Sequence, residues 1–567
     1  MELINKLSKD KIFLLIFIAI IILSLYVRFN NLSEVGYWND DQATLPAGLM
    51  WFYPNTYFPG LNYGNPPLGD MIIGAGCMLS NQDFSGVSQV KPFFYPDRFF
   101  LLGGALSNAD FFCHLPMYVF GLLFLAISIV FAFSFFGKYS ALFLTAFFAF
   151  YPQVLLYSRW IKPDIIFWTL VMLFMFFLLK FYYSDKDEYK LLVVSSLFLG
   201  LSFAAKFTSA ILFLLVMLII IDKYKQEFLS ILKIINKKLS LTILEKIEYK
   251  NPKKLIYLAA TSLAAFIFSA LISYKFNPKN LIETQQIYKR FNPDIGGVDF
   301  NPLNIFETFK EFIFSINAID AILFIISIYV FIFILIKKDK TKLEKFILFL
   351  FLILLIAPSL FSPVSATYRA FPFLLSVIFI ISLLFSDKEY SIFRIFNIKN
   401  ERTFFLIFII IYIVLSSSIA IQSSPYFQTK NHAICIFSDS KYCQTSLLGF
   451  RSKIVADYFK PILNDQETFI GEGGATFFYL KSEQGILDHQ FNMAFQQQLN
   501  RYPNFIEKIQ YFRPNNQTVR YLVLSPDYNK EPVETKSFKQ QYKPNKILKL
   551  KNQEVAYIYD LKNLTLR

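Results

Sequence analysis

Long apolar runs are the feature that most limits how this 567-residue chain can fold. They recur from near the first residue to about residue 421, and 55% of all residues are hydrophobic while only 17% are charged. Inside a bilayer, backbone N–H and C=O groups must find partners within the protein, so runs of this length are expected to cross as helices. Eleven spans are predicted, over residues 12–27, 115–136, 139–157, 165–183, 191–205, 207–221, 255–274, 313–336, 346–361, 371–385 and 403–421.

The Lys and Arg residues between the runs predict the orientation of the chain. With the N-terminus in the cytoplasm, 25 of the 56 basic residues lie in inner segments and 12 in the outer loops, although the outer loops are longer in total. Because these charges are spread between apolar runs, the net charge of +15 does not indicate nucleic-acid binding. Lys6, Lys9 and Lys11 precede the first run and no small-x-small cleavage site follows it, so we expect an uncleaved signal anchor in a multi-pass protein of the cell membrane.

An odd number of spans places the C-terminal part outside the cytoplasm. We predict a transmembrane module over residues 1–421, which includes an extracytoplasmic loop at 28–114, and an extracytoplasmic C-terminal domain over 422–567. Strand-like runs at 519–526 and 554–561 suggest a small α/β unit in that domain. The predicted fold class is an all-α polytopic membrane protein of about eleven transmembrane helices with a small α/β C-terminal domain.

The four cysteines contain no CxxC pair, which argues against a zinc knuckle or a thioredoxin-like site. Cys77 and Cys113 lie in the first outer loop. Cys435 and Cys443 lie close together after the last run, and a disulfide between them is one possibility in an oxidising space.

The outer loop contains the segment "WNDDQA", with two adjacent carboxylates, Asp40 and Asp41, shortly after the first span. One interpretation is that they cap a helix that begins near Gln42. The other is that they do acid–base chemistry, and the two roles are compatible. Further along the same loop, a Pro-Pro step within "NPPL" predicts a short helix at the membrane interface.

Isolated cations occupy three other outward turns, where the positive-inside bias disfavours them. They are Arg159, Lys206 and Arg369. Each could be a residue whose charged end reaches the interface. As a set, they suggest an anion at the outer leaflet, for which a lipid phosphate is the natural candidate. His114 and Asp110, beside the second span, are expected to be structural.

The order of these features resembles the C-type membrane glycosyltransferases of the protein O-mannosyltransferase and aminoarabinose transferase superfamily. That family carries R-x-x-x-L…W-x-D-E-A after its first span, then H/K-P-P-L, an R-x-x-x-x-D turn, G-L-x-x-x-x-K-x-T and R-Y/F-x-x-P. The corresponding segments here are "RFNNLSEVGYWNDDQA" (28–43), "NPPL" (65–68), Arg159 to Asp164, "GLSFAAKFT" (200–208) and "YRAFP" (368–372).

The resemblance implies a glycosyltransferase that takes a sugar from a polyprenyl-phosphate donor and gives it to a protein, lipid or glycan acceptor on the outer face of the membrane. Asp40 would be the general base of an inverting transfer. Asp41 would orient the acceptor, and in metal-using relatives the two acids would help to hold a divalent metal ion. Arg159, Lys206 and Arg369 would stabilise the phosphate leaving group, with Tyr368 beside them.

Two departures from the family pattern affect these roles. The second acid is Asp41 instead of glutamate, and Asn65 replaces the His or Lys before Pro-Pro, which leaves a hydrogen-bonding role for that residue at the substrate. Trp38 would stack on the sugar or belong to the interfacial aromatic belt.

Two other classes of function compete with this one. A transporter or flippase of lipid-linked saccharides would need charged or broken segments at the bilayer midplane. Asp320 in the eighth span is the clear acid within an apolar run. A membrane anchor that displays residues 422–567 as a binding module would need far fewer than eleven spans.

Overall fold

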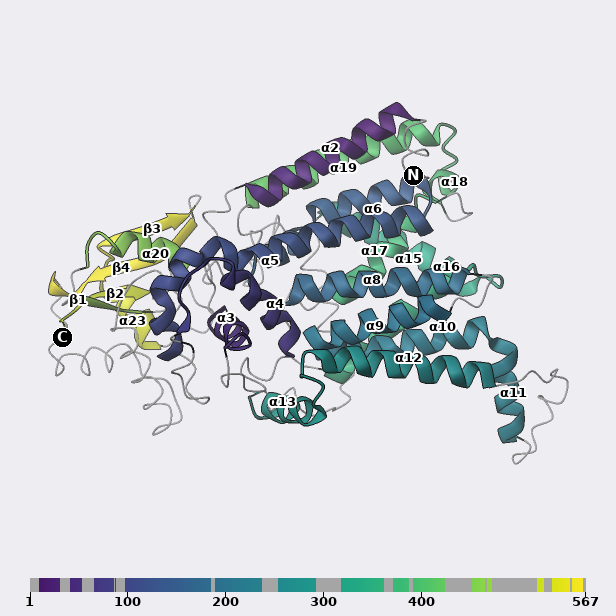
Figure 1. The fold of residues 1–567 in the computed structure, drawn as a ribbon. Coiled ribbons are helices and arrows are strands. Elements are labelled where there is room, and N and C mark those ends of the chain that lie inside the picture. Colours follow the sequence, from purple (N-terminus) through teal and green to yellow (C-terminus); the bar gives the residue numbers. More distant parts are fainter. Residues whose placement is uncertain are drawn as a thin grey trace.

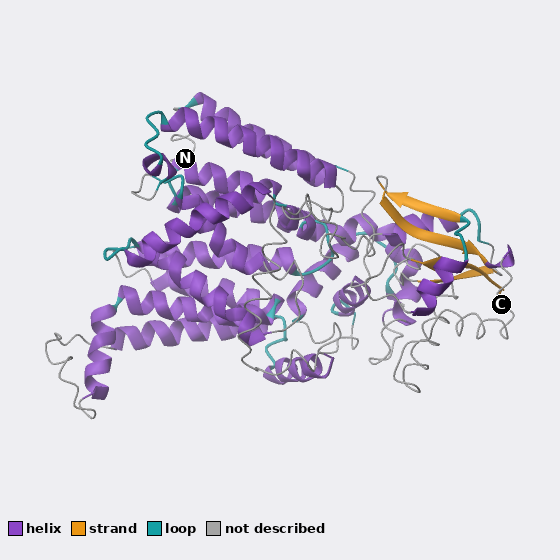
Figure 2. Cartoon of the chain, turned by 180° about the vertical axis from the view of Figure 1, so that it is seen from behind, coloured by secondary structure: helices purple, strands orange, loops and turns teal. Residues whose placement is uncertain are grey.

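The structure is a computed structural model in which most of the chain is helical (Figures 1 and 2). Only part of the chain is described below. The described residues are 10–30, 41–53, 66–85, 87, 97–184, 189–236, 253–291, 318–361, 371–386, 391–423, 451–463, 467–471, 518–524, 533–550 and 553–563.

Each of the eleven predicted spans contains a described helix, in two cases as a pair of helical segments, and residues 313–317 of the eighth span lie outside the described part of the chain. The elements are α2 (Lys11–Phe29), α5 (Asp97–Phe135), α6 (Lys138–Phe150) with α7 (Pro152–Tyr157), α8 (Asp164–Tyr183), α9 (Tyr189–Ala205), η3 (Phe207–Leu212) with α10 (Phe213–Lys223), α12 (Lys253–Ile272), α15 (Ala318–Ile336), α16 (Lys342–Phe361), α17 (Phe371–Leu383) and α19 (Glu401–Ser423). Among the described residues, five of these helices are long and apolar enough to cross a membrane unaided. The membrane character of the chain is therefore clear, while eleven crossings remain a prediction.

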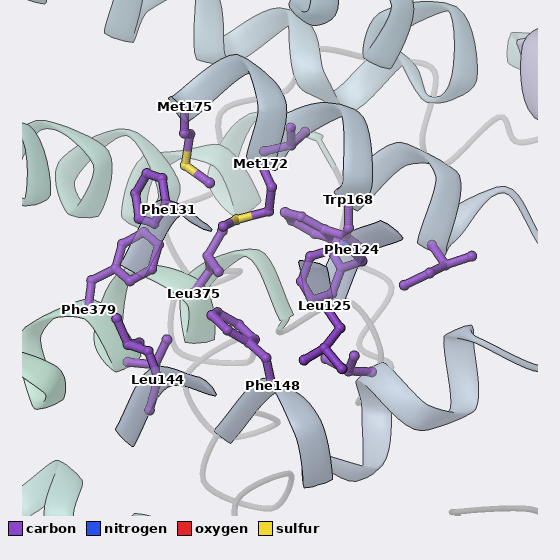
Figure 3. Close-up of a cluster of buried hydrophobic side chains, with 14 of the residues drawn as sticks. Phe124, Leu125, Phe131, Leu144, Phe148, Trp168, Met172, Met175, Leu375 and Phe379 are labelled. Atoms are coloured by element: carbon purple, nitrogen blue, oxygen red, sulfur yellow. The ribbon is translucent and has the colours of Figure 1, made fainter. Parts of the chain in front are cut away.

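The helices pack side by side around a continuous apolar core. α9 lies between α8 and α12, and α5 packs on α8. Figure 3 shows a part of the core where α5, α6, α8 and α17 meet. The rings of Phe131 and Phe379, from α5 and α17, stack there with their centroids 5.3 Å apart. Buried side chains of this kind interlock the bundle by close packing, since apolar burial alone gives little driving force within lipid.

Segments predicted to be cytoplasmic gather at one end of the bundle. Figure 1 shows the start of α2 near α18 (Ile392–Ile395), while the sheet, α3 and α4 lie toward the other end. At the α2 start, the carboxylate of Asp10 pairs with Lys138 at 2.6 Å and with Arg402 at 2.9 Å. α11 (Lys225–Asn236) bends away from α10 by 93° at the same end.

The segment predicted to be the first outer loop contributes two short helices and the first part of α5, which begins at Asp97, well before the predicted start at 115. α3 (Asp41–Met50) and α4 (Pro67–Met78) pack against each other, and α4 also packs on α5 and α9. The Pro-Pro step begins α4, as predicted, with Pro66 as its N-cap. α4 is largely buried within the protein, whereas an interfacial position was expected, because its glycines allow neighbouring backbones to approach closely.

The C-terminal region contains a mixed four-stranded sheet in the order β1-β2-β4-β3. β2 (Thr518–Leu524) and β4 (Gln553–Asp560) correspond to the two predicted strand-like runs. β1 (Glu467–Gly471) pairs with β2 in parallel, and the pairs of β4 with β2 and with β3 (Lys546–Leu550) are antiparallel.

Each face of this sheet is covered by a helix. Val455 and Phe459 of α20 (Arg451–Phe459) pack on one face, and Phe538 of α23 (Val533–Gln541) packs on the other. The predicted small α/β unit is therefore present. α20 also brings Ala456 into the apolar cluster of the helical bundle.

Candidate functional site

The structure describes three of the eight predicted site residues. Asp41, Arg159 and Lys206 lie within the described part of the chain. The other five lie outside it, and their roles remain predictions. They are Trp38, Asp40, Asn65, Tyr368 and Arg369.

Asp41 is the first residue of α3, so a helix does begin beside the acid pair, as the capping interpretation expected. A carboxylate at this position is favourable because the unpaired N–H groups of the first turn carry partial positive charge. Adjacent Asp40 falls immediately before the described residues of α3. The start of α3 therefore fixes the backbone position of Asp41, one of the two acids.

Lys206 lies at a break between two helical segments. α9 ends at Ala205, Lys206 adopts an extended backbone, and η3 begins at Phe207. The ammonium of Lys206 lies 2.5 Å from Oδ1 of Asp164, the first residue of α8. The side chain of Asp164 is 7% exposed and that of Lys206 is 31% exposed. Lys206 is held by one carboxylate. Because an ammonium has three N–H donors, it can still bind a second anion from solvent.

Arg159 is engaged with the C-terminal end of α2. Its NH2 nitrogen donates to the backbone oxygens of Val27 at 2.7 Å, Arg28 at 2.9 Å and Asn30 at 2.7 Å. The residue is 1% exposed. In this arrangement the guanidinium is a buried cap of a helix end, where cations are favourable.

Arg28 is a buried residue of this region that the sequence argument did not single out as functional. Its guanidinium donates to the carbonyl oxygen of Ala149 at 2.8 Å and to that of Phe148 at 3.1 Å. Phe148 lies four residues before Pro152, which has no N–H to donate, so the α6–α7 break leaves its carbonyl without the usual helical partner. The proline within the third apolar run was the signal that such a carbonyl needs a donor from elsewhere.

The first turn of α4 lies against the turn that carries Arg159 and Asp164. A Cβ atom on Gly69 would lie 2.2 Å from the Cβ of Pro163, and one on Gly74 would lie 2.2 Å from the backbone of Gly48 in α3. Only glycine permits backbones to approach this closely. α4 therefore connects the Asp41 helix with the Asp164–Lys206 pair.

A disulfide joins Cys77 in α4 to Cys113 in α5. The sequence placed both residues in the outer loop, but it gave no reason to pair them, because 36 residues separate them. Disulfides persist in oxidising compartments, which agrees with the outward position predicted for this loop. The alternative pair, Cys435 and Cys443, lies outside the described residues.

His114, beside this disulfide, is buried as expected of a structural residue. Its Nδ1 lies 2.9 Å from the backbone oxygen of Asp110, one turn earlier in α5, and its ring stacks on that of Tyr118. Within the described residues, no group of three or more His, Cys, Asp or Glu side chains is arranged to hold a metal ion. A metal held by Asp40 and Asp41 remains a prediction, since neither side chain is described.

No family model and no curated protein matches this sequence. Among solved structures, ArnT from Cupriavidus metallidurans bound to undecaprenyl phosphate is similar at 10% identity and a TM-score of 0.46, with 95% of this chain and 97% of that chain covered. The Archaeoglobus fulgidus oligosaccharyltransferase in complex with Zn and sulfate is similar at 12% identity and a TM-score of 0.37, over 90% of this chain and 68% of that one. The S. cerevisiae protein O-mannosyltransferase Pmt1-Pmt2 complex bound to the sugar donor is similar at 15% identity and a TM-score of 0.27, over 47% and 34%.

Each of these likenesses has a TM-score below 0.5. At identities of 10% to 15% such similarity says nothing about substrate or mechanism, which must be inferred from the chain's own residues.

Proposed function

We propose that this protein is an integral-membrane glycosyltransferase that moves a sugar from a polyprenyl phosphate to an acceptor on the outer face of the membrane. The observation that carries the proposal is the ion pair between Lys206, whose side chain is partly exposed, and the buried carboxylate of Asp164. This ion pair lies at the start of α8 and the end of α9, against which α4 packs, and α4 in turn packs on the helix that begins at Asp41. The proposal therefore puts an anion site, at Lys206, and the acid pair at the same end of the bundle.

The chemistry follows from these groups. The acceptor oxygen attacks the anomeric carbon of the sugar, its proton passes to Asp40, and the bond from that carbon to the phosphate oxygen breaks. The electron pair of the broken bond stays on the lipid phosphate, whose added negative charge Lys206 and Arg369 stabilise. Attack opposite the leaving group inverts the configuration at the anomeric carbon. Asp41 orients the acceptor, and a divalent metal ion, where the reaction uses one, would be held by Asp40 and Asp41.

Asp40→Asn tests the proposal most directly. General-base catalysis contributes about 10²–10⁴-fold to the rate, so we expect transfer from a polyprenyl-phosphate sugar to fall by that factor while membrane insertion and thermal unfolding stay unchanged. Initial rates are to be measured with purified protein and a panel of polyprenyl-phosphate sugars.

Asp83→Asn is the matched control, because Asp83 is an exposed acid of the same outer loop whose carboxylate accepts a hydrogen bond from the Ser85 amide at 2.8 Å. Normal turnover in Asp40→Asn would exclude Asp40 as the base. Movement of a lipid-linked sugar across vesicle membranes, without any transfer, would instead favour the transporter.

A further inference from the structure

Two buried arginines, Arg28 and Arg159, link three chain segments at the outward end of the bundle. We propose that Arg159 is a positioning residue: it fixes the turn that carries Asp164, and through Asp164 the ammonium of Lys206, to the end of α2, and it does not itself bind the donor phosphate. The inference rests on the proposed function for the role of Lys206, and it reassigns Arg159 within that site.

The contacts of Arg159 are those of a helix cap. Its NH2 nitrogen carries two hydrogens and has three backbone oxygens within 2.9 Å, so this nitrogen is fully used inside the protein. Within the described residues, the last hydrogen bond of α2 runs from the Asn30 amide to the oxygen of Tyr26, and it leaves the carbonyls of Val27 and Arg28 without a donor in this part of the helix. Arg159 supplies donors to both of them. Releasing the guanidinium to a phosphate would take the Arg159 donors away from these carbonyls, which is unfavourable for polar groups in a buried region.

Arg28 makes the reciprocal contact. It leaves the same last turn of α2 and donates to the carbonyls of Phe148 and Ala149 at the end of α6, where Pro152 interrupts the helical hydrogen bonds. α7 then leads directly to Arg159. The two guanidiniums therefore close a ring of contacts, from α2 to α6, along α7, and back to α2. These contacts hold the segment from the end of α6 to Arg159 against α2 at both ends of that segment.

The turn after Arg159 transmits this position to Lys206. Four residues lie between Arg159 and Asp164, and within them the amide of Lys162 donates to the oxygen of Trp160 at 2.7 Å. Pro163 is the N-cap of α8 and contacts Gly69 of α4. Asp164 then holds the ammonium of Lys206. A shift at residue 159 is thus expected to move the carboxylate that holds the cation.

A double-mutant cycle tests this route. Undecaprenyl phosphate is the probe, and its dissociation constant is measured with the purified full-length chain in detergent for Arg159→Met, Lys206→Gln and the double variant. If Arg159 acts through Lys206, each single substitution raises the dissociation constant about tenfold. In the Lys206→Gln background, Arg159→Met then raises it by a further factor of less than about two. An equal loss in both backgrounds would make Arg159 an independent phosphate ligand and would overturn the inference.

Hydrogen exchange on the same proteins tests the cap without any ligand. Arg159→Met is expected to speed amide exchange both at the end of α2 and in the turn at 158–164. Unchanged exchange at these two places would contradict the inference, and so would a lower melting temperature with an unchanged dissociation constant. If Arg159→Met does not fold, Arg159→Lys replaces it in both experiments, since one shorter ammonium cannot reproduce the guanidinium contacts.

The two experiments also separate this inference from the proposed function. If the wild-type chain does not bind undecaprenyl phosphate, the proposed donor class is wrong, and hydrogen exchange alone decides whether Arg159 fixes the turn. If binding is normal but Asp40→Asn keeps full turnover, the proposed mechanism is wrong. The double-mutant cycle still decides whether Arg159 is a positioning residue.

Discussion

The ammonium of Lys206 pairs with a buried carboxylate while the Lys206 side chain is 31% exposed, which is an arrangement suited to a cation that meets an anionic leaving group. Lys206→Gln keeps a polar side chain but removes the charge. Loss of one group that stabilises developing negative charge typically costs about 10²–10³ in turnover, and we expect a decrease of that size in initial rates with a polyprenyl-phosphate sugar. Lys279→Gln is the matched control, because Lys279 is 79% exposed in α13 (Pro278–Phe291), within the loop predicted to lie outside. Equal rates for the two variants would exclude Lys206 from the site.

At the scale of single residues, the sequence identified the charged side chains but not their partners. The start of a helix beside Asp41 followed from the capping pattern, while the outward side of Lys206 stays a prediction. The contacts of Arg28 and Arg159 were not predictable, because they join residues more than 100 positions apart. Which carbonyl lacks a donor depends on where two helices end in space, and no local pattern records that.

Among the helices, α4 determines how the two halves of the candidate site meet. Gly74 touches Gly48 so closely that an added Cβ would overlap the backbone of α3. Gly74→Ala is therefore expected to force α3 away from α4, to lower stability by about 1–3 kcal/mol as overpacking typically does, and to reduce transfer more than it reduces phosphate binding. Thermal unfolding and initial rates are the measurements. Gly137→Ala is the control, since a Cβ at Gly137 would meet nothing within 4 Å, and an equally small effect at both positions would contradict a close α3–α4 contact.

The sequence predicted the existence of α4 from its Pro-Pro step, and it predicted the long helices from their apolar runs. It did not predict that α4 is buried. The burial of α4 depends on four of its twelve residues, Gly69, Gly74, Gly76 and Cys77. The three glycines each touch a different segment of the chain, and Cys77 is joined to α5 by the disulfide. Small residues in an apolar stretch look the same whether they face lipid or another backbone, so the distinction needs the fold.

At the scale of the whole molecule, two units of different physical character are joined. The bundle is held together by apolar packing, whereas one end of the C-terminal sheet carries an ion cluster in which Arg520 donates to both oxygens of Glu467 at 2.9 Å and Lys562 donates to one of them at 3.2 Å. Partial burial alone would raise the pKa of the Glu467 carboxyl. The hydrogen bonds and charges of the two cations outweigh this, so that its pKa lies below the ordinary value of 4.5.

Acid should therefore loosen the C-terminal unit before the bundle. A carboxyl whose pKa is lower in the folded state contributes its full stability above the unfolded value and loses it as the pH falls through the folded value. We expect the amides of β1 to lose hydrogen-exchange protection, corrected for the intrinsic pH dependence, as the pH falls below the ordinary carboxyl value of 4.5, while amides of α8 keep theirs. Glu467→Gln should start with weaker protection in β1 and show a smaller change over the same interval, because its side chain does not titrate. A pH dependence of equal size in the variant would assign the acid sensitivity to other carboxylates and would remove Glu467 from the account of how this domain is held together.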